Sequence, residues 1–265
     1  KINLIDVGMK NFVSIVLRRL VLTILLVLFT VPSFAQLADK LKKLDKVSGV
    51  KELPVGEKMK SPFAEKVVMF VEQPIDHSNP SAGTFKQRVI VALADYNAPT
   101  VIVTEGYGAA YALRPNYREE VSDLLNTNMV VVEHRYFLES IPFMQQDSTI
   151  TDETLNWDYM TAVNEAADLH NVNQMLRSVF HGKWIATGIS KGGQTAMFYT
   201  AYYPNDLDVS VPYVGPLCKG VEDGRHEPFL ANYAGTQKDR EIIKAFQVEF
   251  LSSFRALHYR FPSLF

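Results

Sequence analysis

A serine flanked by glycines, in the stretch GISKGGQTA at residues 188–196, is the clearest candidate for chemistry in this sequence. Ser190 stands between Gly188 and the pair Gly192 and Gly193, with a strand-like run before it and a helix-like run after it. Because glycine has no Cβ atom, this pattern allows a sharp strand-to-helix turn. A hydroxyl at the apex of such a turn is exposed beside backbone N–H groups, which suits a nucleophile. The alternative is a glycine-rich turn with an incidental serine, since G-x-S-x-G alone occurs by chance.

The elements expected around this motif decide between the two interpretations. Residues 66–74 and 87–96 flank a segment rich in turn formers and predict an antiparallel hairpin. Beyond it, strands are expected at 100–104, 128–136, 183–188 and 208–215, and helices at 114–127, 152–180 and 191–203. This alternation predicts an α/β fold with a mostly parallel sheet. An N-terminal antiparallel hairpin leading into such a sheet, with G-x-S-x-G between strand and helix, indicates an α/β-hydrolase and favours Ser190 as the nucleophile.

The same fold predicts where an oxyanion hole would lie. One N–H belongs to the residue after the nucleophile, which is Lys191, and the second comes from the loop after the third hydrolase strand. That loop is TEGYG at residues 104–108, where the glycines allow the backbone to approach a substrate closely. The sequence leaves open whether Gly106 or Tyr107 supplies the second N–H.

The N-terminal part predicts export. Residues 1–8 precede Met9 and are interpreted as an upstream extension, and the following segment has basic residues, a short apolar run and a small-x-small motif ending at Ala35. This pattern predicts a signal peptide over residues 1–35, cleaved after Ala35, and a secreted or periplasmic protein without stable membrane insertion. The alternative is an uncleaved anchor, but the apolar run of residues 20–31 is short for a membrane span.

The composition excludes several classes of protein. The 265 residues have a formal net charge of −2, which does not suggest a nucleic-acid partner. Cys218 is the only cysteine, so this sequence can form no intrachain disulfide and no cysteine-rich zinc site. There is also no H-E-x-x-H motif, and we expect neither a metal nor a cofactor.

Five stretches carry a resemblance to a known family. They are VEQPIDHSNPSAGTFKQRV (71–89), TEGYG (104–108), EHRYF with ES (133–140), GISKGG (188–193) and VPYVGPL (211–217). In this order they resemble the secreted bacterial prolyl tri- and tetrapeptidyl aminopeptidases, and more distantly the Pro-Xaa carboxypeptidases. The resemblance implies a serine exopeptidase of α/β-hydrolase fold that releases short peptides from free N-termini, often after proline. Residues 36–62 would then form a lead-in segment, 63–221 the core, and 222–265 the start of a helical cap.

The sequence does not show the rest of a catalytic triad. In this fold the acid and the histidine follow the nucleophile. His77, His134, His170 and His181 all precede Ser190, whereas His226 and His258 lie in the expected cap. We therefore interpret the chain as a fragment that lacks the C-terminal part of the fold, with the acid and base beyond Phe265, and expect it to be nearly inactive by itself.

Carboxylates near strand ends are the candidates for binding a substrate ammonium group. They are Glu105, Glu133 and Glu139, although Glu133 could instead pair with Arg135 or cap a turn. His134 is expected to order the loop beside the site, and Trp157 and Tyr159 to pack the long helix. Asp223 and Arg225 could reach the cleft or form a solvated pair. The leading hypothesis is a secreted aminopeptidase acting on peptides with free N-termini. The alternatives are a secreted esterase or lipase on the same scaffold and an inactive fragment.

Overall fold

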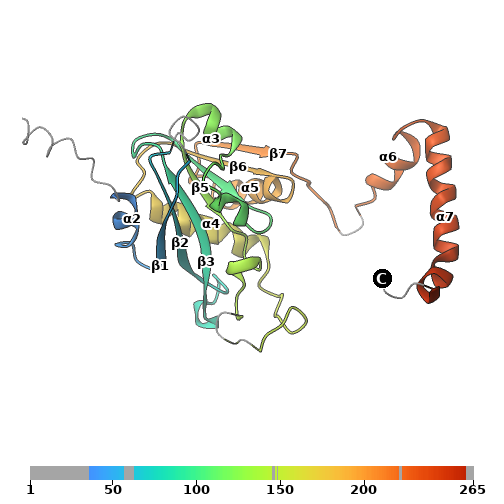
Figure 1. The fold of residues 1–265 in the computed structure, drawn as a ribbon, viewed down its shortest axis with the longest axis horizontal. Coiled ribbons are helices and arrows are strands. Elements are labelled where there is room, and N and C mark those ends of the chain that lie inside the picture. The colour runs from blue at the N-terminus through green and yellow to red at the C-terminus, as the bar shows by residue number, and fades with distance from the viewer. Residues whose placement is uncertain (1–35, 57–62, 145–146, 148, 221–222, 261–265) are drawn as a thin grey trace, which may run out of the picture. The chain divides into compact units, whose positions relative to one another are not determined.

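The computed structural model describes residues 36–56, 63–144, 147, 149–220 and 223–260 (Figure 1). The expected signal peptide, its cleavage site and the upstream extension lie outside these residues. The described chain forms two compact units that divide between Pro216 and Leu217, close to the expected start of the cap. In the second unit the described elements are α6 (His226–Asn232) and α7 (Gln237–Arg260). None of the described helices is long and apolar enough to cross a membrane.

A seven-stranded sheet organises the described part of the first unit, in the order β1-β2-β3-β5-β4-β6-β7. The strands are β1 (Val47–Leu53), β2 (Glu65–Pro74), β3 (Thr84–Leu93), β4 (Thr100–Thr104), β5 (Asn128–Val132), β6 (Trp184–Ile189) and β7 (Val209–Tyr213). All but β1 and β3 run in the same direction, because β4 to β7 pair in parallel and β3 is antiparallel to both β2 and β5. The predicted hairpin and mostly parallel sheet are confirmed, and with them the α/β-hydrolase fold.

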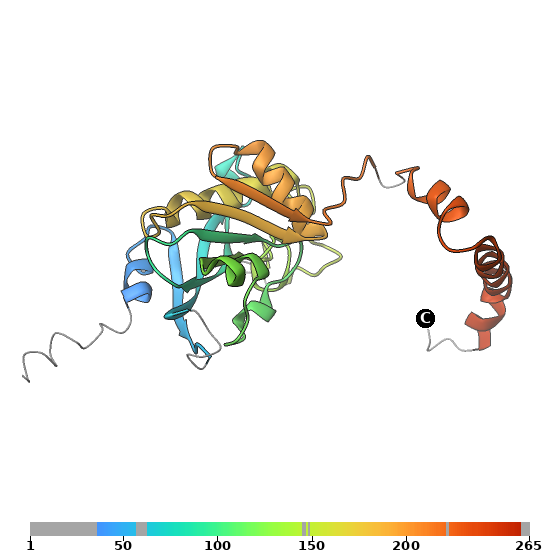
Figure 2. The ribbon, with the colours of Figure 1, turned by 90° about the horizontal axis from the view of Figure 1, so that it is seen from above.

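Helices cover both faces of the sheet (Figure 2). One face packs against α4 (Ala162–Leu176) and α5 (Lys191–Tyr202), and the other against α3 (Glu120–Leu125). Strands β4 and β5 lie at the centre, and every residue in them is buried. Central parallel strands are covered on both faces, which explains their continuous apolar sequences. The apolar face of α4 joins the core through Leu169, Val172 and Leu176.

Two expected helices are shorter than their periodicity predicted. Only Glu120–Leu125 of the segment 114–127 is helical, because the Glu119 carboxylate caps the helix by accepting the Ser122 N–H and Asn126 ends it in a left-handed conformation. Only Ala162–Leu176 of the segment 152–180 is helical, because the Thr161 hydroxyl caps it at the Asn164 N–H. The residues before Thr161 form turns, so their apolar spacing does not reflect a helix.

Two further differences concern the strands. The lead-in segment supplies α2 (Gln36–Leu41) and strand β1, which pairs with β2 although its sequence is largely polar. An edge strand with exposed side chains has no strong hydrophobic alternation, so the pattern did not reveal it. The strand expected over 128–136 ends at Val132, because the following side chains turn into a buried polar network rather than continuing the ladder.

Candidate functional site

Ser190 lies at the turn between β6 and α5, where the sequence predicted it. Its φ of 57° and ψ of −118° are strained for a residue other than glycine, and its side chain is exposed. Ser190 is also the first residue before α5, so its hydroxyl stands beside the backbone N–H groups that begin this helix. The predicted position is confirmed, and the strained backbone is typical of a nucleophile elbow.

The parallel strands bring three loops to the same edge of the sheet. Gly106 follows β4, His134 follows β5 and Ser190 follows β6, and β4 pairs with both β5 and β6. Because the carboxyl ends of parallel strands meet at one edge, these loops lie next to one another. The fold therefore places the predicted oxyanion loop and Ser190, the predicted nucleophile, together.

Gly106 packs directly on the start of α5. A Cβ atom at this position would lie 2.6 Å from Lys191 Cβ and 2.7 Å from the Gly192 nitrogen. Only glycine allows so close an approach between the two backbones. The packing puts the backbone of the 104–108 loop beside the backbone of Lys191, as the predicted oxyanion hole requires.

This packing leads to a prediction for Gly106→Ala. The added methyl group would collide with the backbone of Lys191 and Gly192, which cannot move without deforming the elbow. We expect a loss of about 1–3 kcal/mol in the free energy of unfolding, measured with urea. Gly108→Ala is the matched control, because its methyl group would collide with the exposed, movable side chain of Leu138 and would otherwise meet Glu133 Oε2 at 3.6 Å, an ordinary contact distance. Equal losses of stability in the two variants would show that the close contact between the two backbones is not what requires glycine at position 106.

The Lys191 ammonium group is held by His134. Lys191 Nζ lies 2.8 Å from His134 Nε2 and over the rings of Tyr107 and Phe137, 5.6 Å and 5.9 Å from their centroids. His134 Nδ1 is 2.7 Å from the Arg135 carbonyl oxygen, which can only accept, so Nδ1 carries the hydrogen and Nε2 accepts from Lys191. Burial and the Lys191 charge lower the pKa of His134 to about 4, and the imidazole is therefore neutral at pH 7.

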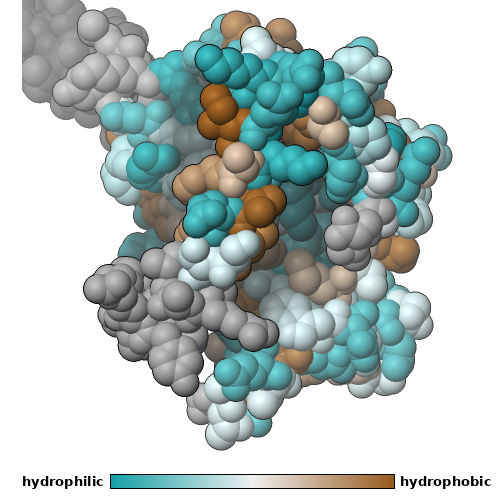
Figure 3. Space-filling view, turned by 90° about the vertical axis from the view of Figure 1, so that its right-hand side faces the viewer, coloured by the Kyte–Doolittle hydropathy of each residue, from teal (hydrophilic) through white to brown (hydrophobic). Residues whose placement is uncertain are grey.

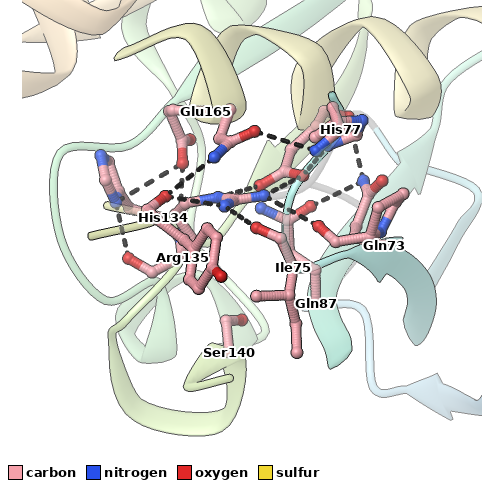
Figure 4. Close-up of polar contacts among 12 residues, drawn as sticks. Gln73, Ile75, His77, Gln87, His134, Arg135, Ser140 and Glu165 are labelled. Atoms are coloured by element: carbon pink, nitrogen blue, oxygen red, sulfur yellow. Dashed lines mark hydrogen bonds and ion pairs between the residues drawn. The ribbon is translucent and has the colours of Figure 1, made fainter. Parts of the chain in front are cut away.

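Arg135, the residue after His134, belongs to a buried ion pair (Figure 4). Arg135 donates from Nε and Nη2 to the two oxygens of Asp168, each at 2.8 Å, and both side chains are completely buried. The same guanidinium also donates to the carbonyl oxygens of Pro74, Ile75 and Tyr159. Figure 4 shows His134 and Glu165 on one side of Arg135 and His77 on the other. The network ties the hairpin, β5 and α4 together directly behind the loop that carries His134.

Glu165 adjoins the backbone of Arg135 and the ring of His134. Its Oε2 accepts the Arg135 backbone N–H at 3.3 Å and is 3.5 Å from His134 Nδ1. Its Oε1 is buried and has no hydrogen-bond partner among the described residues. Burial raises the pKa of Glu165 to about 8, with a smaller contribution from Asp168. The carboxyl group is therefore mostly protonated at pH 7.

The three predicted ammonium-binding carboxylates have different environments. Glu105 is half-buried directly before Gly106 and accepts the Tyr111 hydroxyl, and burial raises its pKa to about 7. Glu133 is fully buried, and its oxygens accept from Arg88, Ser140 and two backbone N–H groups. This environment favours a structural role for Glu133 over substrate binding. Its arginine partner is Arg88 rather than the expected Arg135. Glu139 is exposed and lines a different hollow of about 390 Å³, beside Lys86. Of the three, only Glu105 adjoins the Ser190 loop.

The other side chains singled out from the sequence have local partners. Trp157 stacks on Tyr136 with 5.1 Å between centroids, in the turns before α4 rather than on a long helix. His77 contacts Asp168 at 2.7 Å, and His170 contacts Asp206 at 2.7 Å. In the second unit Arg225 pairs with Asp223 and with the Leu217 carbonyl oxygen. Within the described part of the chain, no histidine hydrogen-bonds to the Ser190 hydroxyl, and no cluster of His, Cys, Asp and Glu could hold a metal ion.

Sequence reasoning missed Glu165 and Asp168. Both occur in α4 among positions whose neighbours Leu169 and Val172 are core residues, and an acidic side chain on a buried helical face is unusual. This pattern could have identified them, because a buried carboxylate requires a partner and Arg135 follows the apolar strand β5.

Comparison with known proteins agrees with this geometry. The family model described as PS-10 peptidase S37 matches residues 32–263. The prolyl tri/tetrapeptidyl aminopeptidase of Streptomyces mobaraensis is 32% identical over 218 residues, which cover 82% of this chain and 42% of that protein. The lysosomal Pro-X carboxypeptidase of Mus musculus is 30% identical over 148 residues, covering 52% of this chain and 30% of that protein. The chain thus spans less than half the length of these curated relatives.

Solved structures with a similar fold include acetyl xylan esterase 1 from Thermoanaerobacterium sp. JW/SL YS485. It has a TM-score of 0.43 and 14% identity, and the match covers 79% of this chain and 63% of that one. A putative dipeptidyl aminopeptidase IV from Bacteroides ovatus ATCC 8483 matches with a TM-score of 0.39 and 13% identity, over 55% of this chain and 20% of that one.

Proposed function

The chain belongs to the peptidase S37 family, and we propose that it carries the nucleophile of a serine exopeptidase that releases tri- or tetrapeptides from free peptide N-termini. The observation that carries this proposal is Ser190, exposed on a strained strand-to-helix turn with the Gly106 loop packed against it. Cleavage after proline and export with removal of residues 1–35 belong to the same proposal and rest on the motifs and the N-terminal pattern described above.

In the proposed mechanism Ser190 Oγ attacks the scissile carbonyl carbon. The Lys191 N–H and the N–H of Gly106 or Tyr107 stabilise the negative charge that develops on the carbonyl oxygen. The amine of the shortened peptide leaves, and water hydrolyses the acyl-enzyme. The reaction also needs a base that takes the hydroxyl proton and then gives it to the nitrogen of the leaving amine. The described contacts of Ser190 do not include one.

A peptide substrate would suit a surface on which polar and apolar groups are mixed. Figure 3 shows a face that is hollowed, with hydrophobic and hydrophilic side chains around the hollow. A peptide needs both kinds of contact, because its backbone forms hydrogen bonds and its side chains, proline included, contact apolar groups.

The experiment that tests this function compares blocked and unblocked substrates. The native protein that contains this chain should cleave tripeptide p-nitroanilides ending in proline when their N-terminus is free, and much more slowly when it is acetylated. Equal rates on both would contradict an aminopeptidase. A preference for fatty-acyl esters over peptides would show that the scaffold carries an esterase instead.

We further propose that Glu105 binds the substrate ammonium group, and this predicts a dependence on pH. The carboxylate is ionised above its pKa of about 7 and loses its charge below it. The ratio of kcat/KM for free over acetylated substrates should therefore rise as the pH increases through 7 and fall again as the peptide amine, with a pKa of about 8, loses its proton. Glu105→Gln should abolish the rise near pH 7, whereas Glu139→Gln, away from the site, should keep it. An unchanged profile in Glu105→Gln would exclude this role.

A further inference from the structure

A small pocket lies between the N-terminal turns of α4 and α5, beside the residue that follows Ser190. Its volume is about 190 Å³, below the range of about 300–1,000 Å³ typical of pockets for drug-sized ligands, so it suits a single side chain or a short terminal group. Apolar walls and ionisable groups share the lining. The apolar side chains are mainly Met160, Ala166 and Phe198. The ionisable ones are His134, Glu165 and Lys191.

Lys191 brings a positive charge to this pocket. One hydrogen of its ammonium group is donated to His134 Nε2, and an ammonium group has three. No carboxylate of the described chain forms an ion pair with it. Because His134 is neutral, the Lys191 charge is not compensated from that side.

Glu165 is protonated, so it provides a hydrogen-bond donor rather than a second charge. The nearby guanidinium of Arg135 is already bound by Asp168 and by three carbonyl oxygens. The charges of Arg135 and Lys191 lower the pKa of Glu165, but burial and Asp168 raise it by more, and neither cation forms an ion pair with the carboxyl group. A carboxyl group that is 3% exposed and has no cationic partner takes up a proton. Because Oε2 accepts the Arg135 N–H, the proton belongs on Oε1, the atom that has no partner.

The N-termini of α4 and α5 add partial positive charge to the pocket. Thr161 and Ala162 at the start of α4, and Lys191 at the start of α5, line the pocket. The N-terminus of a helix carries partial positive charge and favours anions. A cation in this pocket would meet Lys191 and two helix N-termini, which disfavours binding of the substrate ammonium group here.

We propose that this pocket binds a carboxylate, which accepts a hydrogen bond from Lys191 Nζ and, once the Glu165 side chain turns its buried Oε1 toward the ligand, a second from that atom, while its methylene groups contact Met160, Ala166 and Phe198. The proposal rests on the peptidase function proposed above, because that reaction supplies two sources of the group. One is the acidic side chain of a substrate peptide, and the other is the C-terminal carboxylate of the released peptide.

The first arm of the test measures substrate preference in the native protein. The substrates are tripeptide p-nitroanilides ending in proline, with Ala, Asn, Gln, Asp, Glu or Lys at each of the other two positions. At one position an acidic residue should raise kcat/KM about tenfold over its amide, as expected for a charge-assisted hydrogen bond, and lysine should lower it. Lys191→Met should remove this preference, and Lys183→Met, which removes an exposed lysine before β6, should retain it. Glu165→Gln should also retain it, because an amide can donate, and Glu165→Leu should weaken it.

The second arm identifies the released peptide as the source. Tripeptides ending in proline should inhibit as free acids about tenfold better than as C-terminal amides, and Lys191→Met should abolish the difference. The pocket proposal is overturned if acid and amide behave alike in both arms, or if either preference persists in Lys191→Met. Circular dichroism checks that each variant is folded, and Glu165→Leu provides an independent variant if Lys191→Met is not.

Failure of the pocket and failure of the proposed function give different results. Cleavage of free-amine peptides without any charge preference would refute the pocket and leave the peptidase in place. If no peptide is cleaved, the Tm measured with propionate or with propionamide still tests whether the pocket binds a carboxylate. Propionate alone should raise the Tm of the native protein and not that of Lys191→Met, and equal effects of the two compounds would refute the pocket.

Discussion

Ser190→Ala should lower kcat of the native protein by roughly 10⁴–10⁶-fold, because removal of a catalytic nucleophile leaves only the contributions of binding and the oxyanion hole. The fold should be unaffected, since Ser190 is exposed and its side chain accepts no capping hydrogen bond from α5. The variant should still bind its peptide substrates, so their KM should change little. The measurement is the steady-state rate on a tripeptide p-nitroanilide, together with labelling by a fluorophosphonate probe.

Ser178→Ala provides the matched control. Ser178 is an exposed serine just after α4, and its hydroxyl donates only to the Met175 carbonyl oxygen. The control should keep both activity and labelling, whereas Ser190→Ala should lose both. Labelling that persists in Ser190→Ala, or that maps to another serine, would show that the elbow is not the nucleophile.

The elbow could be predicted from sequence because its signals are local. Glycines at fixed offsets, a β-branched strand before them and a helix after them are sufficient to place Ser190, and the structure confirms the turn. The Gly106 loop could be placed in the same way, because parallel strands bring their carboxyl ends to one edge. The lengths of α3 and α4 could not be predicted in this way, because caps at Glu119 and Thr161, rather than periodicity, decide where these helices begin.

The polar network behind the site depends on contacts between distant parts of the sequence. Glu133 was a candidate for substrate binding because it lies near a strand end, but β5 ends at Val132 and the Glu133 side chain turns inward to Arg88 on β3. Arg135 in turn pairs with Asp168, a residue on α4. Pairings of this kind depend on which elements become neighbours, and no local pattern specifies the partner. The sequence therefore predicts the nucleophile and its loop better than it predicts the groups that position them.

Asp168→Ala should reduce the free energy of unfolding by about 3–5 kcal/mol, because removing one partner of a buried ion pair leaves the other charge without compensation. Arg135 is completely buried, and carbonyl oxygens alone would have to stabilise its charge. The loss is large compared with a typical domain stability of about 5–15 kcal/mol. Urea unfolding of the native protein, followed by circular dichroism, measures it.

Asp123→Ala is a chemically matched control, since Asp123 also pairs with an arginine, Arg118, but at the surface. Water screens that pair, and its loss should cost about 1 kcal/mol or less. The double variant Arg135→Met with Asp168→Leu should recover part of the stability lost in Asp168→Ala, because no buried charge remains unpaired. It should not recover peptidase activity, because a methionine side chain cannot donate to the carbonyl oxygens of the hairpin, and the loop that carries His134 would lose these bonds. If Asp168→Ala and Asp123→Ala lost equal stability, the buried pair would not be what fixes α4 against that loop.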